Sequence, residues 1–226
     1  MKYFIANWKS HKSLDEGKEW LTIFQDLLKQ DSVIQNKLRD HEVSIILCPP
    51  FHLLHPLKDM FAKYPNYALG AQNISPYPEG SYTGEIAAKL IKDIVNFTII
   101  GHSERRKYFH EKDGDVVLKT DIALYENIKP IVCIRSEHDE IPKNINLVAY
   151  EPVEAIGTGQ NASVAEVLEM RNKLSLNPGS TFIYGGSVDT KNCKEYIQTE
   201  GIDGLLIGSA SLNPSTFFSI ISSVKP

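Results

Sequence analysis

The chain has 226 residues, of which 42% are hydrophobic, and its formal net charge is −4. This length allows one large hydrophobic core, and the mild acidity argues against general nucleic-acid binding. The three cysteines form no CxxC pair, which excludes a disulfide framework and a cysteine-based zinc site. The N-terminus becomes polar too soon for a signal peptide, and no apolar run is long enough for a membrane helix, so we expect a cytoplasmic protein.

Eight short apolar segments recur along the chain and have the composition of buried parallel strands. Most contain four to six residues and are continuously apolar, with many isoleucines and valines. In chain order they are Tyr3–Ala6, Val43–Leu47, Tyr67–Leu69, Phe97–Ile100, Pro130–Ile134, Ile145–Tyr150, Thr181–Tyr184 and Gly204–Ile207.

Helical patterns separate most of these strands. Leu14–Lys29 places apolar residues at helical spacing, and Ser163–Leu174 repeats the pattern behind a capping box. Asp189–Gln198 and Pro214–Val224 also fit a helix. Eight strands with seven or eight helices predict a single domain, residues 1–226, folded as a closed (β/α)8 barrel. A doubly wound open sheet is the alternative, but eight strands in so short a chain favour the barrel.

Polar residues directly follow several of the strands. Asn7 and Lys9 follow the first strand, His102 the fourth and Glu151 the sixth. Because strand ends converge on one face of a barrel, these residues are expected to surround one pocket. Glu151 is a candidate general base with a raised pKa, and a neutral His102 could donate a hydrogen bond to a carbonyl oxygen. The alternative for His102 is a residue leading into a helix that Ser103 caps.

Two glycine–serine turns follow the last two strands and precede helical patterns. They are Gly185-Gly186-Ser187 and Gly208-Ser209, whose backbone N–H groups could hold a phosphate. Each could also be an ordinary tight turn, but barrels often bind phosphate at this place. Lys9 could supply a fixed positive charge to an anionic substrate, although a lone lysine is more often a solvated surface residue. Together these residues indicate proton abstraction next to a carbonyl group.

Seven motifs occur in order over essentially the whole chain. They are NWK at 7–9, CPP at 48–50, AQN…YTGE at 71–85, IIGHSERR at 99–106, AYEPV.AIGTG at 149–159, YGGSV at 184–188 and DGLLIGSASL at 203–212. In this order they resemble the triosephosphate isomerase family. The resemblance implies a TIM barrel that interconverts D-glyceraldehyde 3-phosphate and dihydroxyacetone phosphate in glycolysis and gluconeogenesis, without a metal or cofactor. The alternatives are a catalytically weak relative that binds triose phosphates, with a regulatory or scaffold role, and another phosphosugar isomerase or epimerase.

The resemblance also implies a role for each candidate residue. Glu151 would move the substrate proton, His102 would polarise the carbonyl, and Lys9 would stabilise the enediolate. Asn7 would contact substrate oxygens, and Glu104 would lie near Lys9. The residues whose backbone N–H groups would bind the phosphate are Gly157, Ser187, Gly208 and Ser209.

Residues 152–162 would form a lid behind the catalytic glutamate, and closing it would exclude water from the enediolate. The lid departs from the family pattern at Glu154, where tryptophan is usual, and at Gln160, where lysine is common. After the fifth strand, Arg135-Ser136 replaces the usual glycine and glutamate. Since that glutamate partners the lid tryptophan in the family, we expect a replacement contact between Glu154 and Arg135, worth about 0–1 kcal/mol.

A second departure is a shortened connection between the fifth and sixth strands. Only residues 135–144 separate the two apolar segments, and Pro142 disfavours a helix there. We therefore expect the fifth helix to be missing or reduced to a turn. The loop at 71–85 keeps its length; in the family this loop, with a threonine at the position of Thr83, reaches into a neighbouring subunit, so a homodimer is expected.

Overall fold

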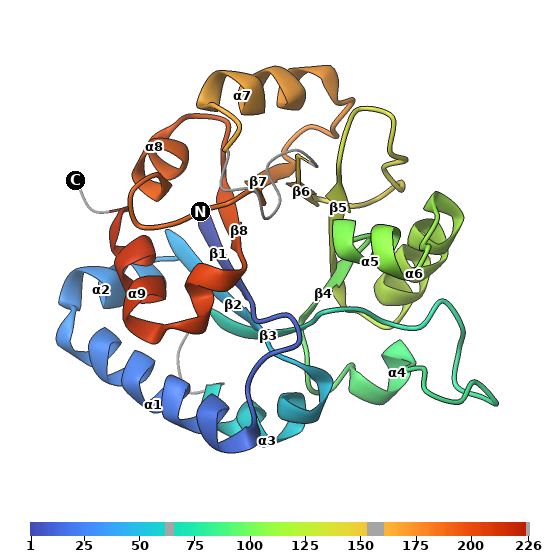
Figure 1. Ribbon diagram of the computed structural model, residues 1–226, viewed down its shortest axis with the longest axis horizontal. Helices are drawn as coiled ribbons and strands as arrows, with labels where there is room; N and C mark the ends of the chain where they lie inside the picture. The colour runs from blue at the N-terminus through green and yellow to red at the C-terminus, as the bar shows by residue number, and fades with distance from the viewer. Residues whose placement is uncertain (62–65, 153–160, 225–226) are drawn as a thin grey trace.

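The computed structural model describes residues 1–61, 66–152 and 161–224, and its eight strands form a closed barrel. Every strand pairs in parallel with the next along the chain, and β8 closes against β1 (Figure 1). The strands are β1 (Lys2–Asn7), β2 (Val43–Cys48), β3 (Tyr67–Ala71), β4 (Phe97–Ile100), β5 (Lys129–Ile134), β6 (Leu147–Tyr150), β7 (Thr181–Tyr184) and β8 (Gly204–Ile207). The predicted (β/α)8 TIM barrel is confirmed.

Nine α-helices occur in the described residues, rather than the seven or eight expected, because two connections carry a pair of helices. These helices are α1 (Leu14–Gln30), α2 (Ser32–Arg39), α3 (Phe51–Phe61), α4 (Ala88–Ile91), α5 (Ser103–Tyr108), α6 (Asp113–Tyr125), α7 (Val164–Lys173), α8 (Cys193–Gln198) and α9 (Pro214–Ser222). Helix α8 begins later than predicted because Asp189 accepts the N–H groups of Lys191 and Asn192 in a turn. Within the described ranges, every helix is too short or too polar to cross a bilayer.

Alternate strand residues bury their side chains on opposite sides of the barrel wall. In β1, Ile5 belongs to the cluster inside the barrel, whereas Phe4 and Ala6 belong to the cluster beneath the helices. Burial on both sides explains why the strand segments are nearly continuous apolar runs. The residues that fill the barrel interior include Ile46, Cys48, Ile99, Ile131, Cys133, Ala149, Ile183 and Leu206.

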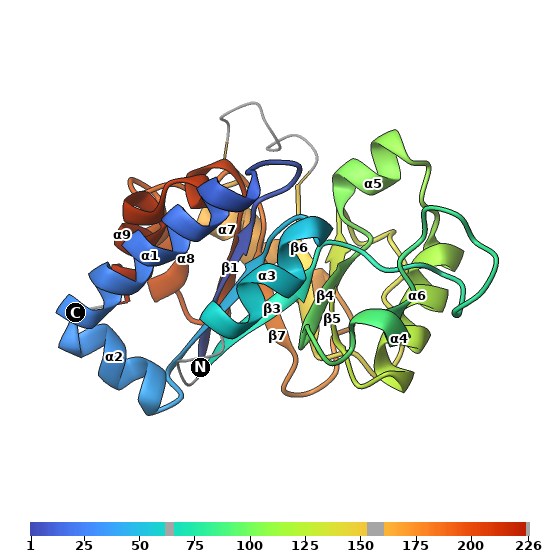
Figure 2. The same cartoon turned by 90° about the horizontal axis from the view of Figure 1, so that it is seen from below.

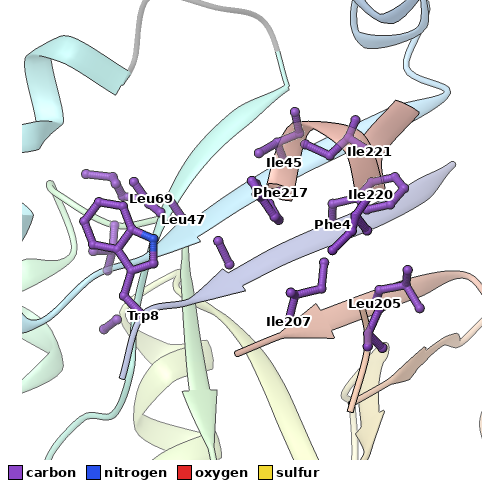
Figure 3. Close-up of a cluster of buried hydrophobic side chains, with 14 of the residues drawn as sticks. Phe4, Trp8, Ile45, Leu47, Leu69, Leu205, Ile207, Phe217, Ile220 and Ile221 are labelled. Atoms are coloured by element: carbon purple, nitrogen blue, oxygen red, sulfur yellow. The ribbon is translucent and has the colours of Figure 1, made fainter. Parts of the chain in front are cut away.

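Helix α9 covers the outside of the wall near β1, β2 and β8. Its residues Phe217, Ile220 and Ile221 are fully buried in the same cluster as Phe4 and Ile45 (Figure 3). Each such side chain contributes about 1.5–3 kcal/mol to stability relative to an exposed position. This packing fixes the last strand, and with it the turn that follows β8.

The connection from β5 to β6 contains no helix in residues 135–144, all of which are described. It passes as bends and turns between α7 and the α5–α6 pair (Figure 1). The expected loss of the helix that would follow the fifth strand is confirmed. By contrast, the loop between β3 and α4 extends away from the barrel in both ribbon views (Figures 1 and 2). Tyr77 and Tyr82 stack on each other in this loop, with ring centroids 4.5 Å apart.

Candidate active site

A cavity of about 670 Å³ opens where the strands end at their carboxyl termini. Seven of the eight residues predicted to act on or bind the substrate line this cavity: Asn7, Lys9, His102, Glu151, Ser187, Gly208 and Ser209. The eighth, Gly157, lies outside the described residues. The convergence follows from parallel pairing, since all eight strands deliver their carboxyl ends to one face.

Lys9 enters the cavity from a left-handed backbone conformation, with φ 51°. Non-glycine residues rarely adopt this conformation, which costs about 1–3 kcal/mol unless the surroundings impose it. Here Asn7 Oδ1 accepts a hydrogen bond from the Lys9 N–H at 3.1 Å, and Gln72 Nε2 donates to the Lys9 carbonyl at 2.9 Å. The same Gln72 nitrogen donates to the Cys48 carbonyl at 2.9 Å. Gln72 was not predicted as a site residue, although it lies in the AQN motif.

The ammonium group of Lys9 is oriented by two neighbours. Its Nζ lies 2.6 Å from Glu104 Oε1, so the two residues form the contact that the resemblance implied. Its stem passes close to Gly208, where a Cβ would lie 3.2 Å from Lys9 Cε. A side chain at position 208 would therefore press on the lysine, and glycine leaves it room.

His102 and Glu151 form a buried pair at the centre of the site. His102 Nε2 lies 2.9 Å from Glu151 Oε1, and the side chains are 8% and 3% exposed. His102 also caps α5, because its Nδ1 accepts the Glu104 N–H at 3.2 Å. The capping residue is thus His102 rather than the expected Ser103. With Nδ1 acting as an acceptor, the neutral ring carries its hydrogen on Nε2, which faces the carboxylate.

Glu151 is held from three sides, and its pKa differs from the sequence expectation. Its Oε2 accepts the Ser103 N–H at 2.8 Å, and its own N–H donates to the Ile134 carbonyl at 2.8 Å. Burial raises the pKa of the Glu151 carboxyl, but His102, the Ser103 N–H and Lys9 together lower it below its ordinary value. The expected raised pKa is therefore wrong for this arrangement, because specific partners outweigh desolvation.

The protonation of His102 follows from the same pair. Burial lowers the pKa of the imidazole, but the adjacent Glu151 carboxylate raises it above its ordinary value, with a smaller contribution from Glu104. A substrate oxygen that took the place of the carboxylate at Nε2 would remove that stabilisation of the charged ring. Replacing the carboxylate at Nε2 by an uncharged oxygen would therefore lower the pKa of His102.

The two glycine–serine turns line the cavity after β7 and β8, beside Glu151 and Lys9: a Cβ at Gly185 would lie 3.0 Å from Glu151 Cγ. The first is held by Asn192, whose Nδ2 donates to the Ser187 carbonyl at 2.9 Å. The second leads into a 3₁₀ helix, Ser209–Leu212, in which the Ser211 N–H and hydroxyl both donate to the Gly208 carbonyl. Such fixed turns present backbone N–H dipoles that can bind an anion.

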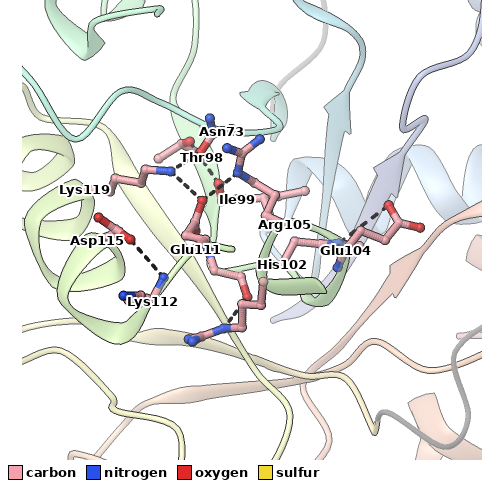
Figure 4. Close-up of polar contacts among 12 residues, drawn as sticks. Asn73, Thr98, Ile99, His102, Glu104, Arg105, Glu111, Lys112, Asp115 and Lys119 are labelled. Atoms are coloured by element: carbon pink, nitrogen blue, oxygen red, sulfur yellow. Dashed lines mark hydrogen bonds and ion pairs between the residues drawn. The ribbon is translucent and has the colours of Figure 1, made fainter. Parts of the chain in front are cut away.

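Next to His102, Glu111 joins three segments (Figure 4). Its carboxylate accepts the Gly101 N–H at 3.0 Å, Arg105 Nε at 2.6 Å and Lys119 Nζ at 2.5 Å. Lys119 also donates to Asn73 Oδ1 at 2.9 Å, which connects α6 to the base of the 71–85 loop. This network was not predicted: Gly101, Arg105, Glu111 and Lys119 lie within 18 residues of one another, but only the folded chain turns their polar groups together and brings in Asn73, 46 positions from Lys119.

The departures in the lid are only partly within the described structure. Glu154 and Gln160 lie outside the described residues, so a Glu154–Arg135 contact stays a prediction. Arg135 lines the cavity mouth and already pairs with Asp139, at 2.6 Å from Nη2 to Oδ1.

Comparison with known proteins identifies close relatives over nearly the full length. A sequence profile described as "Triosephosphate isomerase" matches residues 2–146 and 138–224. Proteins named triosephosphate isomerase from Alkaliphilus oremlandii (strain OhILAs) and Nitratidesulfovibrio vulgaris (strain DP4) are 36% and 34% identical to the chain. The first alignment covers 96% of this chain and 97% of the relative, and the second covers 97% and 98%. The two profile matches overlap within 138–146, inside the shortened connection.

Proposed function

Because the chain belongs to the triosephosphate isomerase family, we propose that it interconverts D-glyceraldehyde 3-phosphate and dihydroxyacetone phosphate. The observation that carries this proposal is the buried pair of His102 and Glu151, whose Nε2 and Oε1 atoms lie 2.9 Å apart. A base and a hydrogen-bond donor at this spacing can act on a carbon and its neighbouring oxygen in the same substrate.

In the proposed reaction each of these groups has its own role. The Glu151 carboxylate takes a proton from the carbon next to the carbonyl and returns it to the adjoining carbon. The His102 Nε2–H donates to the carbonyl oxygen as charge develops there, and the ring moves a proton between the two oxygens. Lys9, held in place by Glu104, stabilises the negative charge of the enediolate and the phosphate. Asn7 fixes the lysine backbone and borders the same cavity.

The phosphate would bind at the part of the cavity lined by Ser187, Gly208 and Ser209. Gly157 would add its N–H from the 152–162 segment, which follows directly behind the base in the sequence. Because the base and the lid over the phosphate belong to one chain segment, closing the lid would position the base and exclude water at the same time.

A coupled assay of purified protein with D-glyceraldehyde 3-phosphate, run beside Glu151→Asp, tests this function. Shortening the side chain by one methylene withdraws the carboxylate by about 1 Å, so kcat should fall about 100-fold or more. A wild-type protein that binds triose phosphate without turnover would support the alternative of a catalytically weak binding relative. Turnover unaffected by the substitution would remove Glu151 from the role of base.

We further propose a homodimer formed through loop 71–85 and a cytoplasmic location. The projection of the loop from the barrel and the exposed Tyr77–Tyr82 stack support a contact with another subunit. Three buried, unpaired cysteines support a reducing compartment.

A further inference from the structure

The shortened connection between β5 and β6 contains a buried carboxylate, that of Asp139, which is 8% exposed. Glu137, His138 and Glu140 around it are exposed. The Asp139 carboxylate accepts three hydrogen bonds from Arg135: from the backbone N–H at 2.7 Å, from Nε at 3.0 Å and from Nη2 at 2.6 Å. Burying a carboxylate costs desolvation free energy, which hydrogen-bond donors such as those of Arg135 offset.

One peptide group connects the Asp139 carboxylate to the backbone of the catalytic base, Glu151. The peptide between Ile134 and Arg135 donates its N–H to Asp139 Oδ2 and accepts the Glu151 N–H on its carbonyl oxygen, at 2.8 Å. Because a peptide group is planar and rigid, fixing its N–H also fixes the direction of its carbonyl. Asp139 therefore orients the acceptor to which the backbone of Glu151 is attached.

A second route leads from Asp139 to the catalytic histidine. Arg106, a buried cation, lies with Nη1 4.0 Å from Asp139 Oδ1 and 2.7 Å from the more exposed Asp113 Oδ1. Its Nε donates to the Gly101 carbonyl at 2.9 Å, and Gly101 directly precedes His102. Without Asp139, the charge of Arg106 would be balanced chiefly by Asp113 at the surface, and the guanidinium would be drawn toward it.

We propose that Asp139 is a positioning residue for the isomerase reaction. It holds Glu151 and His102 in their relative geometry in a chain whose connection between β5 and β6 contains no helix. This inference rests on the proposed function. Asp139 does not line the cavity among the described residues, so it acts through Arg135, Arg106 and the backbone, without touching the substrate.

The test compares Asp139→Asn and Asp139→Ala with Glu140→Gln, which removes an exposed carboxylate from the same connection. Asparagine has nearly the same shape as aspartate but lacks the charge and offers fewer acceptors to Arg135. We expect kcat to fall about 10- to 100-fold in the Asp139 variants, because small misplacement of catalytic groups has effects of this size. The KM should stay within about threefold of wild type, since substrate contacts remain. Glu140→Gln should match the wild type in both constants.

Amide hydrogen exchange supplies a readout that does not depend on activity. The Glu151 amide should exchange at least about tenfold faster in Asp139→Asn than in wild type, while the amide of Ile5, on the far side of the barrel, should be unchanged. If wild type proves inactive but the Glu151 amide responds, the proposed function fails while the structural step stands.

Three results would overturn the proposal. The first is a kcat within twofold of wild type in both folded Asp139 variants. The second is a loss confined to KM, and the third is a Glu151 amide with wild-type exchange. If neither variant folds, Asp139 is required for the fold as a whole, and the narrower positioning role is rejected.

Discussion

Replacing Glu111 with glutamine should destabilise the protein more than any substitution of an exposed carboxylate. The Glu111 side chain is 2% exposed and serves donors from three segments: Gly101, Arg105 and Lys119. Glutamine retains one acceptor oxygen but turns an NH2 group toward donors and removes the negative charge. Lys119, whose side chain is 4% exposed, would then keep only Asn73 Oδ1 among the contacts described above.

The magnitude follows from the burial of the pair. Removing one partner of a buried ion pair costs about 3–5 kcal/mol, because the other charge stays desolvated. The contact of Lys119 with Asn73 and the partial exposure of Arg105 favour the lower end, so we expect a loss of about 3 kcal/mol. For a chain of this size that corresponds to a decrease in Tm of roughly 6–12 °C.

Urea unfolding followed by tryptophan fluorescence measures this loss, since Trp8 and Trp20 are both buried. Repeating it at several protein concentrations separates subunit dissociation from unfolding. Glu169→Gln, which breaks an exposed pair with Lys173 on α7, is the matched control and should leave the unfolding curve essentially unchanged. A loss below about 1 kcal/mol in Glu111→Gln, or one equal to the control, would refute the reasoning that this ion pair is energetically isolated from water.

Three further predictions concern the titration of Glu111, the backbone at Gly101 and the loop at 71–85. Burial raises the pKa of Glu111 but Lys119 and Arg105 lower it below its ordinary 4.5, so its stabilisation is present above that value and is lost as the pH falls through the folded-state pKa. Acid unfolding by circular dichroism should therefore depend less on pH in Glu111→Gln. Gly101→Ala should lower both Tm and kcat, because φ is +73° and the new Cβ would lie 3.0 Å from Val116; wild-type values would contradict this. Thr83→Arg should yield monomers with reduced activity in light scattering and the coupled assay, whereas an unchanged mass would argue against the dimer.

The barrel could be predicted because the sequence pattern of each strand lies within a few consecutive residues. Each strand carries its own apolar run, and the ten residues with Pro142 between β5 and β6 leave no room for a full helix. The grouping of Lys9, His102 and Glu151 also followed, since parallel strands bring their carboxyl ends together whatever the details of packing.

The pKa shifts, hydrogen bonds and side-chain burial in the site could not be predicted, because they depend on contacts that only the folded chain makes. The pKa of Glu151 is lowered because His102 Nε2 lies 2.9 Å from its Oε1 and because the Ser103 N–H and Lys9 add to this effect, and no spacing in the sequence encodes these contacts. The clamp of Gln72 on Lys9 spans 63 positions of the chain. In the sequence, Asp139 is one of several acidic residues in a polar loop. Only the structure shows that it is buried against Arg135 and Arg106.

The short connection between β5 and β6 also affects how the chain folds. Residues 135–146 join these two strands, whereas residues 8–42 join β1 to β2, a connection roughly three times longer. Closing the shorter loop costs about 1 kcal/mol less conformational entropy in the unfolded chain. Pairing of parallel strands is slow because distant segments must first meet, so the most local pair gains an advantage. We expect β5 and β6 to pair early, which would make the segment that lost its helix a starting point for assembly of the barrel.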